Sequence, residues 1–298
     1  MTVDDPLFQK LLRKIVHTVV MEEKQKMKTL ANQIVAWMKN YAETSGQKAF
    51  VLGVSGGVDS ALVSTLCAMT GLPTHCVILP CETTPDQTSR GEQHIAWLQS
   101  KFGVNNVFYH KIDLTTTFAA VYDDVCCGHP NYYDELGFAN VKSRLRMIAL
   151  YHIACIQRGL VAGTGNKVED FGIGFFTKYG DGGVDISPIA DLLKSEVRDM
   201  CRELNVLPEL ADAVPTDGLW ADGRSDEDAI GATYTELEWA MQWLEDGKNC
   251  SSTVLVEGLT PRQKQVLEIY TKRHAATMHK LLPIPTFQRE TFERQPGE

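Results

Sequence analysis

The stretch AFVLGVSGGVDS, residues 49–60, decides the fold. Its first half is a continuous apolar run and predicts a strand buried on both faces of a parallel sheet. Its second half predicts a tight turn into a helix, because Gly56 and Gly57 let backbone N–H groups converge and the helix N-terminus adds positive potential. Ser55 and Ser60 place hydroxyls on either side of the turn. The pattern predicts an anion-binding loop, with a tight turn that binds nothing as the alternative.

This loop is not of the Walker type, because GxxxxGK followed by Ser or Thr is absent. It carries an acid instead, Asp59. Magnesium is bound by carboxylate and phosphate oxygens, so Asp59 is a candidate ligand for Mg²⁺ held against phosphates.

The segments after the loop alternate between strand and helix patterns. Short apolar runs predict strands at residues 75–80, 106–114 and 160–165, and helical periodicity appears at 60–69, 88–102 and 140–157. This alternation predicts an α/β fold with a doubly wound, mostly parallel sheet.

Helices are predicted at both ends of this core. Apolar spacing predicts two amphipathic helices within residues 1–45, a helix at 187–204 and further helices to about residue 280. The polar stretch 215–228 predicts a mobile loop or lid. We expect one domain over residues 1–298, with the nucleotide-binding core at 46–210 and the loop and C-terminal helices at 211–298.

Composition excludes several classes of protein. The chain has 29 Lys and Arg against 38 Asp and Glu, a net charge of −9, which disfavours broad binding to nucleic acid. Asp4 and Asp5 stand where a secretory signal is positive, and no apolar run approaches a membrane span, so we expect a cytoplasmic protein. Eight cysteines without a CxxC pair predict reduced thiols, and Cys126, Cys127 and His129 form only a weak metal pattern.

The loop SGGVDS resembles the pyrophosphate loop (PP-loop) of the ATP pyrophosphatase superfamily, whose members transfer AMP from ATP to a carbonyl or carboxylate oxygen. Further motifs narrow the resemblance to the NAD synthetase family. They are NVKSRLRM (140–147), GTGNKVE (163–169), GFFTKYGDGGVDISPIADLLKSEV (174–197), VPT (214–216), SDED with IG (225–231) and HK (279–280). The resemblance covers roughly residues 30–285 and implies an adenine nucleotide alpha hydrolase-like fold.

The resemblance implies a ligase that amidates deamido-NAD to NAD, the last step of NAD biosynthesis. A carboxylate is a poor electrophile, so the family adenylates the nicotinate carboxylate with ATP, releasing pyrophosphate, and ammonia then displaces AMP. ATP is the implied co-substrate and Mg²⁺ the implied cofactor. A fused glutaminase domain would need well over 100 residues ahead of the synthetase part. Only about 45 precede the first predicted strand, so we expect ammonia as nitrogen donor, and a homodimer as in the family.

By resemblance, the Mg²⁺ ligands would be Asp59 and Glu169, which count as catalytic together with Asp181 and Lys194. Glu169 follows a predicted strand, so we expect it at the carboxyl edge of the sheet, where such sheets bind ligands. A solvated glutamate at a helix start is the alternative. The residues expected at ATP are Ser55, Gly56, Gly57, Ser60, Arg146, Thr164, Lys194 and Thr216.

The residues expected at deamido-NAD are Asn140, Arg144, Tyr151, Phe175, Lys178, Asp181, His279 and Lys280. Asn140 and Arg144 share one helix face and Arg146 lies on another, so one face is expected to meet deamido-NAD and the other ATP. A solvated basic face is the alternative. Asp181 is a candidate to receive ammonia, although a structural Asp-Gly-Gly turn has the same pattern. The pair 279–280 is expected on a C-terminal loop, at phosphates or at the surface.

The chain departs from the family pattern in places. Ile78 stands where many bacterial members have Arg before a Leu-Pro pair, which puts one ATP contact in doubt. The segment before GFF is one residue longer than in many members. Residues 126–130 and about the first 25 have no clear counterpart.

Two other functions stay open from sequence. One is an ATP pyrophosphatase that adenylates a nucleobase carbonyl, in GMP or on tRNA; a tRNA enzyme predicts a basic patch or added domain, and neither is evident. The other is a nucleotide-binding protein that has lost catalysis. The retained charges of Asp59, Glu169, Arg144 and Lys194 disfavour it.

Overall fold

The computed structural model describes residues 6–83, 85–127, 130–211, 225–247 and 258–287, without the side chains of residues 6–8, 10–20 and 130. A four-stranded sheet forms its centre, in the order β3-β2-β1-β4 with all pairings parallel. The strands are β1 (Ala49–Gly53), β2 (Thr74–Ile78), β3 (Val107–Lys111) and β4 (Gly159–Val161). The predicted α/β fold with a parallel sheet is confirmed.

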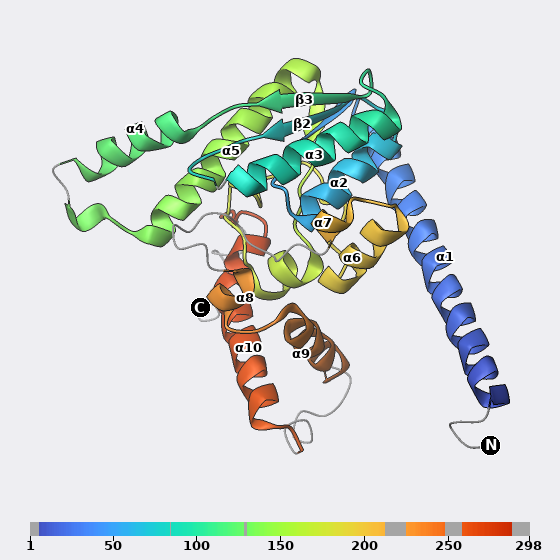
Figure 1. Cartoon of the computed structure of the whole chain (residues 1–298). Helices are drawn as coiled ribbons and strands as arrows, with labels where there is room; N and C mark the ends of the chain where they lie inside the picture. The colour runs from blue at the N-terminus through green and yellow to red at the C-terminus, as the bar shows by residue number, and fades with distance from the viewer. Residues whose placement is uncertain (1–5, 84, 128–129, 212–224, 248–257, 288–298) are drawn as a thin grey trace, which may run out of the picture.

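Helices cover both faces of the sheet (Figure 1). One face packs on α2 (Val58–Met69), α3 (Pro85–Phe102) and α6 (Lys194–Glu203), and the other on α4 (Thr115–Cys126) and α5 (Glu135–Gln157). Successive strand residues point to opposite faces. Phe50 and Leu52 therefore join the α2 side, whereas Val51 packs toward α5.

A third cluster lies beyond the carboxyl ends of the strands. It joins η2 (Lys167–Ile173) to α8 (Asp226–Ile230), α9 (Tyr234–Gly247) and α10 (Pro261–Leu281). Its buried side chains include Val168, Leu237 and Tyr270. The remaining short elements are η1 (Pro130–Tyr132) and α7 (Pro208–Ala211). This cluster places the C-terminal helices at the edge where parallel sheets bind ligands.

The N-terminal segment forms one helix, α1 (Pro6–Thr44), and the prediction of two helices was wrong. The sequence MEEKQKMK at residues 21–28 contains no glycine or proline, so nothing interrupts the helical hydrogen bonds. The second half of α1 packs on α2 and α6, and the first half extends away from the body (Figure 1).

The helix predicted at 187–204 begins only at Lys194. The Glu196 carboxylate accepts a hydrogen bond from the Leu193 backbone N–H at 2.9 Å, which fixes the helix start there. Most of the predicted lid at 215–228 lies outside the described residues, and its end forms the start of α8, with the Ser225 hydroxyl accepting from the Asp228 N–H. None of the described helices has the length and hydropathy to cross a bilayer.

Candidate functional site

A cavity of about 740 Å³ opens at the carboxyl edge of the sheet. The loops after β1, β2 and β4 line one side of the cavity and α5 lines another. Residues of η2, α8 and α10 complete its lining. A volume in this range is typical of sites for small molecules and cofactors. The position agrees with the rule that open α/β sheets bind ligands beyond the carboxyl ends of their strands.

The anion loop, residues 55–60, has its polar groups arranged around one point. The hydroxyls of Ser55 and Ser60 lie 3.0 Å apart, and the Gly57 N–H donates to the Ser55 hydroxyl at 3.2 Å. Gly57 is the N-cap of α2 and offers no side-chain cap. The first N–H groups of α2 therefore remain available to an anion in the cavity.

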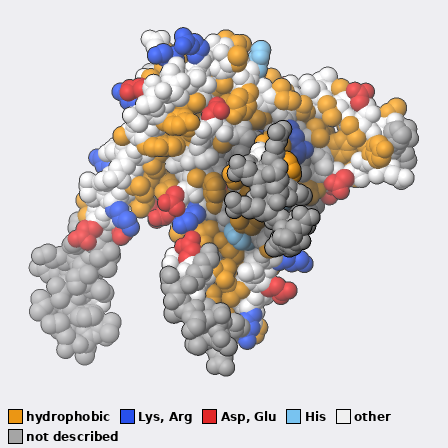
Figure 2. All heavy atoms as spheres, turned by 180° about the vertical axis from the view of Figure 1, so that it is seen from behind, with side chains coloured by type: hydrophobic (Ala, Val, Ile, Leu, Met, Phe, Trp, Pro, Cys, Tyr) orange, Lys and Arg blue, Asp and Glu red, His pale blue; other side chains and the backbone are white. Residues whose placement is uncertain are grey.

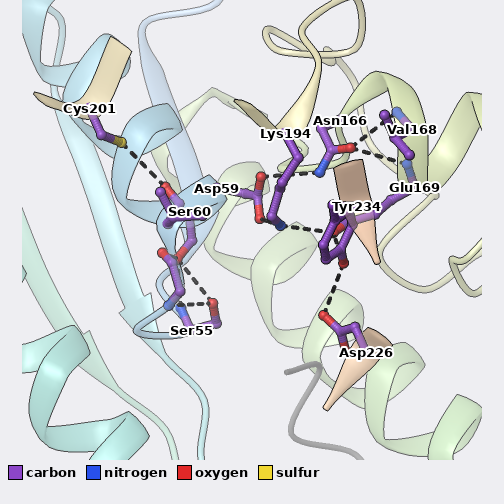
Figure 3. Close-up of polar contacts among 12 residues, drawn as sticks. Ser55, Asp59, Ser60, Asn166, Val168, Glu169, Lys194, Cys201, Asp226 and Tyr234 are labelled. Atoms are coloured by element: carbon purple, nitrogen blue, oxygen red, sulfur yellow. Dashed lines mark hydrogen bonds and ion pairs between the residues drawn. The ribbon is translucent and has the colours of Figure 1, made fainter. Parts of the chain in front are cut away.

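An acid–lysine cluster lies beside this loop (Figure 3). The Lys194 ammonium lies 2.6 Å from an Asp59 carboxylate oxygen and 2.8 Å from one of Glu169. The hydroxyl of Tyr234 also donates to Glu169, and it contacts Asp226 at 3.3 Å. Three of the four predicted catalytic residues are thus brought into direct contact.

Burial and charge act in opposite directions on this cluster. Burial alone would lower the pKa of Lys194, but the two carboxylates outweigh it and raise that pKa, so the lysine is charged. Burial raises the pKa of Glu169, and Lys194 opposes that rise. Burial and the Glu169 charge raise the pKa of the Tyr234 hydroxyl, which therefore stays protonated as a donor.

Asn166 connects the two halves of the cluster. Its side-chain oxygen accepts from the N–H groups of Val168 and Glu169, which caps η2, and its amide nitrogen donates to Asp59 at 3.2 Å. The helix η2 is a π-helix, which has wider turns than an α-helix and is frequent at functional sites.

The donor set of the cluster fits Mg²⁺ bound together with phosphates. Asp59 and Glu169 provide hard carboxylate oxygens, and magnesium sites next to nucleotides use one or two carboxylates plus phosphate oxygens. Within the described residues no group of three or more His, Cys, Asp or Glu could hold a metal ion. A magnesium ion bound by the two carboxylates would take its remaining ligands from phosphate oxygens and water.

The wall from α5 contributes Asn140 and Arg146 to the cavity. Arg146 donates to the Leu79 carbonyl at 3.2 Å and to the Thr83 hydroxyl at 3.1 Å, so it spans from α5 to the loop after β2. Arg144 is exposed and donates to the Lys178 carbonyl. Asn140 and Arg146, which were expected on different faces of this helix, therefore line the same cavity. Arg144, which was expected on the face of Asn140, lies outside that lining.

The segment after η2 is held by α5 and α10. Asp181 accepts hydrogen bonds from the Ser143 hydroxyl at 2.6 Å and the Thr177 N–H at 3.0 Å. The Lys280 ammonium donates to the carbonyls of Gly174 and Phe176 at 2.9 and 2.7 Å. These contacts place Asp181 and Lys280 on the cavity wall, next to the segment with Phe175.

The cavity lining includes twelve of the predicted site residues and leaves five outside. Those inside are Ser55, Gly57, Asp59, Ser60, Asn140, Arg146, Thr164, Glu169, Phe175, Asp181, Lys194 and Lys280. Those outside are Gly56, Arg144, Tyr151, Lys178 and His279, and Thr216 lies outside the described residues. Their roles stay predictions.

Two of the outlying residues have clear positions. Tyr151 donates to Asp185 at 3.0 Å and lines a separate pocket at the other end of the strands. His279 and Lys280 lie in the last turn of α10, so the expectation of a C-terminal loop there was wrong. The carbonyl of His279 accepts from the Lys178 ammonium at 3.0 Å.

Sequence reasoning missed several members of the site. Asn166 lies within the motif GTGNKVE but was not assigned a role. An Asn directly before a helix start is a typical N-cap, and that pattern could have identified it. Asp170 lines the cavity, and burial followed by the Asp181 charge raises its pKa well above the ordinary value. Tyr234 had no local signal, because only the packing of α9 brings it to Glu169.

Comparison with known proteins gives consistent matches. The family model described as NAD synthase matches residues 30–283. The NH(3)-dependent NAD(+) synthetase of Carboxydothermus hydrogenoformans is 35% identical over 208 residues, which are 69% of this chain and 82% of that protein. The enzyme of the same name from Syntrophomonas wolfei is 38% identical over 216 residues, with 70% and 82% covered.

Solved structures share the fold. An NMN synthetase from Francisella tularensis superposes with a TM-score of 0.72 at 28% identity, covering 87% of this chain and 98% of that one. An NH3-dependent NAD synthetase from Campylobacter jejuni gives a TM-score of 0.69 at 22% identity, covering 88% of this chain and 99% of that one. At this identity the match shows a shared fold only.

Proposed function

Because the chain belongs to the NAD synthase family, we propose that its cavity amidates the nicotinate carboxylate of deamido-NAD with ammonia, at the expense of ATP. The chain is then a ligase that forms a C–N bond and completes NAD biosynthesis. One observation carries the proposal. The anion loop and the cluster of Asp59, Glu169 and Lys194 meet in one cavity, which is what activation of a carboxylate by a triphosphate requires.

In the first step the carboxylate oxygen attacks the α-phosphorus of ATP, forming the acyl-adenylate and releasing pyrophosphate. The hydroxyls of Ser55 and Ser60 and the N–H groups at the start of α2 bind the departing phosphates. Asp59 and Glu169 would hold Mg²⁺, which neutralises phosphate charge when bound. Lys194, Arg146 and Thr164 line the cavity and are assigned to ATP. Thr216, which lies outside the described residues, is proposed to join them.

In the second step ammonia attacks the carbonyl carbon and AMP leaves. We assign Asp181 to receive ammonium. One of its oxygens accepts from Ser143 and Thr177, which orients the carboxylate, and the carboxylate takes the proton that ammonium loses before ammonia attacks. Phe175 provides an apolar wall for the pyridine ring, while Asn140 and Lys280 contact the rest of the dinucleotide. Arg144, Lys178 and His279 are proposed to reach the same dinucleotide from outside the lining of the cavity. Tyr151 lies at the other end of the strands, and no role at the dinucleotide is proposed for it.

A second candidate is amidation of the mononucleotide. It is supported by the NMN synthetase from Francisella tularensis, which this chain matches over nearly the full length of that protein. Both reactions use the same carboxylate, ATP and ammonia, so they differ only in the adenylate half of the substrate.

We propose that the chain acts as a homodimer in the cytoplasm, folded as the single domain expected from its sequence. The arm formed by α4, η1 and the start of α5 carries exposed apolar side chains, among them Tyr132, Tyr133 and Leu136 at 62%, 58% and 58% exposure. Figure 2 shows hydrophobic side chains gathered on this arm. Apolar patches of this kind are typical of protein interfaces.

The test is a set of parallel reactions with purified protein, ATP and Mg²⁺. Deamido-NAD or nicotinate mononucleotide is the acceptor, and ammonium or glutamine the nitrogen donor. We expect equal amounts of pyrophosphate and amide from ammonium with deamido-NAD. A clear preference for the mononucleotide would select the second candidate, and absence of pyrophosphate with both acceptors would refute the proposed activity.

A further inference from the structure

Helix α3 packs against the anion loop with no side chain between the two backbones. A Cβ on Gly56 would lie 2.4 Å from the carbonyl oxygen of Gln87, and Gly56 has φ of +82°. A Cβ on Gly91 would lie 3.2 Å from the carbonyl oxygen of Val54 and 2.7 Å from the Ile78 side chain. The first turns of α3 therefore determine where the loop lies.

Arg90 binds the loop at this contact. Its Nε donates to the Gly56 carbonyl at 3.3 Å. The carbonyl of Gly56 and the N–H of Gly57 belong to one planar peptide and point in opposite directions. Holding the carbonyl toward α3 therefore turns the Gly57 N–H toward the Ser55 hydroxyl, which it meets at 3.2 Å on the cavity side.

The same face of α3 supports the helix that follows the loop. His94, one turn after Arg90, contacts the Ser64 hydroxyl at 2.9 Å, and that hydroxyl donates to the Ser60 carbonyl at 2.7 Å. Positions i and i+4 share a helix face. The contacts of Arg90 and His94 thus fix both the turn of the loop and the first turn of α2.

Among the described residues no carboxylate lies within 4.0 Å of the Arg90 guanidinium, and the carbonyl that it binds is uncharged. Lys194, by contrast, contacts both Asp59 and Glu169. Arg90 is only half-buried, and a guanidinium has further donors beyond Nε. A net positive charge therefore lies behind the turn that receives phosphates.

We propose that Arg90 is a positioning residue for the pyrophosphate half of the reaction. It holds the Gly56–Gly57 peptide so that the Gly57 N–H and the Ser55 hydroxyl that it contacts lie at the cavity, and it adds a positive charge behind the turn. The proposal rests on the proposed function for the identity of the anion as the phosphates of ATP. It predicts an effect on ATP and pyrophosphate and none on the substrate that carries the carboxylate.

The experiment titrates inorganic pyrophosphate with Mg²⁺ into ligand-free protein by calorimetry. Arg90→Ala is expected to weaken pyrophosphate binding about tenfold, because a charge-assisted contact is lost. Arg90→Lys keeps the charge without the Nε geometry and is expected to recover part of the loss. Gln93→Ala, at an exposed position of the same helix, is the control and is expected to bind as the wild type does. Should Arg90→Ala not fold, Arg90→Gln replaces it.

Steady-state kinetics provide the second readout. A positioning role raises KM for ATP in the Arg90 variants and leaves KM for the carboxylate substrate unchanged. Pyrophosphate binding within twofold of the wild type, or equal increases of both KM values, would overturn the proposal. The titration needs no turnover, so it reports on Arg90 even if the wild-type protein forms no amide and the proposed function fails.

Discussion

Replacing Lys194 by Met tests how much its charge stabilises the carboxylates of Asp59 and Glu169. Lys194 is 2% exposed, and its ammonium lies 2.6 Å from Asp59 and 2.8 Å from Glu169. Methionine keeps much of the length and removes the charge, so two carboxylates are left facing each other without a cation. Removing one partner of a buried ion pair costs about 3–5 kcal/mol. At roughly 2 °C per kcal/mol for a chain of this size, Tm falls by about 6–10 °C.

The loss should depend on pH in a defined direction. Burial already raises the pKa of Glu169, and without Lys194 that pKa rises further. A carboxyl whose folded pKa lies above its unfolded value binds its proton more tightly in the folded state, so stability falls as pH rises above the unfolded pKa. The Lys194→Met variant is therefore expected to lose most stability at pH 8 and less at pH 5.

The measurement is thermal unfolding by circular dichroism at both pH values, for Lys194→Met and a control. Lys167→Met is a suitable control, because Lys167 lies 3.4 Å from Asp191 and 3.8 Å from Glu245 at the surface, where ion pairs contribute under about 1 kcal/mol. Adding Glu169→Gln to Lys194→Met should restore part of Tm at pH 8. A Tm within 2 °C of the wild type at pH 8, or an equal loss at both pH values, would refute the reasoning.

Three further predictions concern single residues. Asp59→Asn should leave the fold intact, because Lys194 keeps its ion pair with Glu169. The variant should release no pyrophosphate, and unchanged turnover at saturating Mg²⁺ would contradict the assigned metal role. Asp170→Asn should raise Tm at pH 8, because the raised pKa of Asp170 makes its charged form costly, and the gain should shrink as pH falls toward the ordinary aspartate range; a gain independent of pH would exclude that cause. Burial and the neighbouring His110 lower the pKa of His75 to about 4, so the folded state should lose stability as pH drops from 6.5 to 4. In His75→Phe the denaturant midpoint should change less with pH over this range. An unchanged slope of midpoint against pH would exclude His75 as the cause of the loss.

The chain's local patterns predicted the parts of the fold that depend on neighbours in sequence. The run AFVLGV formed β1, and the glycines after it formed the turn into α2, because strand burial and turn geometry are properties of short segments. The boundaries were less accurate. The two halves of α1 merged since no helix-breaking residue separates them, and α6 started late because Glu196 caps it at Leu193.

Most of the site residues predicted from the family motifs line the cavity, including Asp59, Glu169 and Lys194. The motifs did not indicate which atoms meet. That the Lys194 ammonium lies between the two carboxylates follows from the packing of α6 against α2 and from the cap that Asn166 provides for η2.

The sequence by itself determined the sheet, the anion loop and the kinds of group in the site, because strand burial, glycine turns and helix starts are set within a few residues. Only the tertiary structure decided which distant groups touch. Lys194 reaches Asp59 across 135 positions, Tyr234 reaches Glu169 across 65, and Arg90 reaches Gly56 across 34. Such contacts depend on how whole helices pack and on the low dielectric of the interior that makes charge pairing necessary, and neither is written in a local pattern.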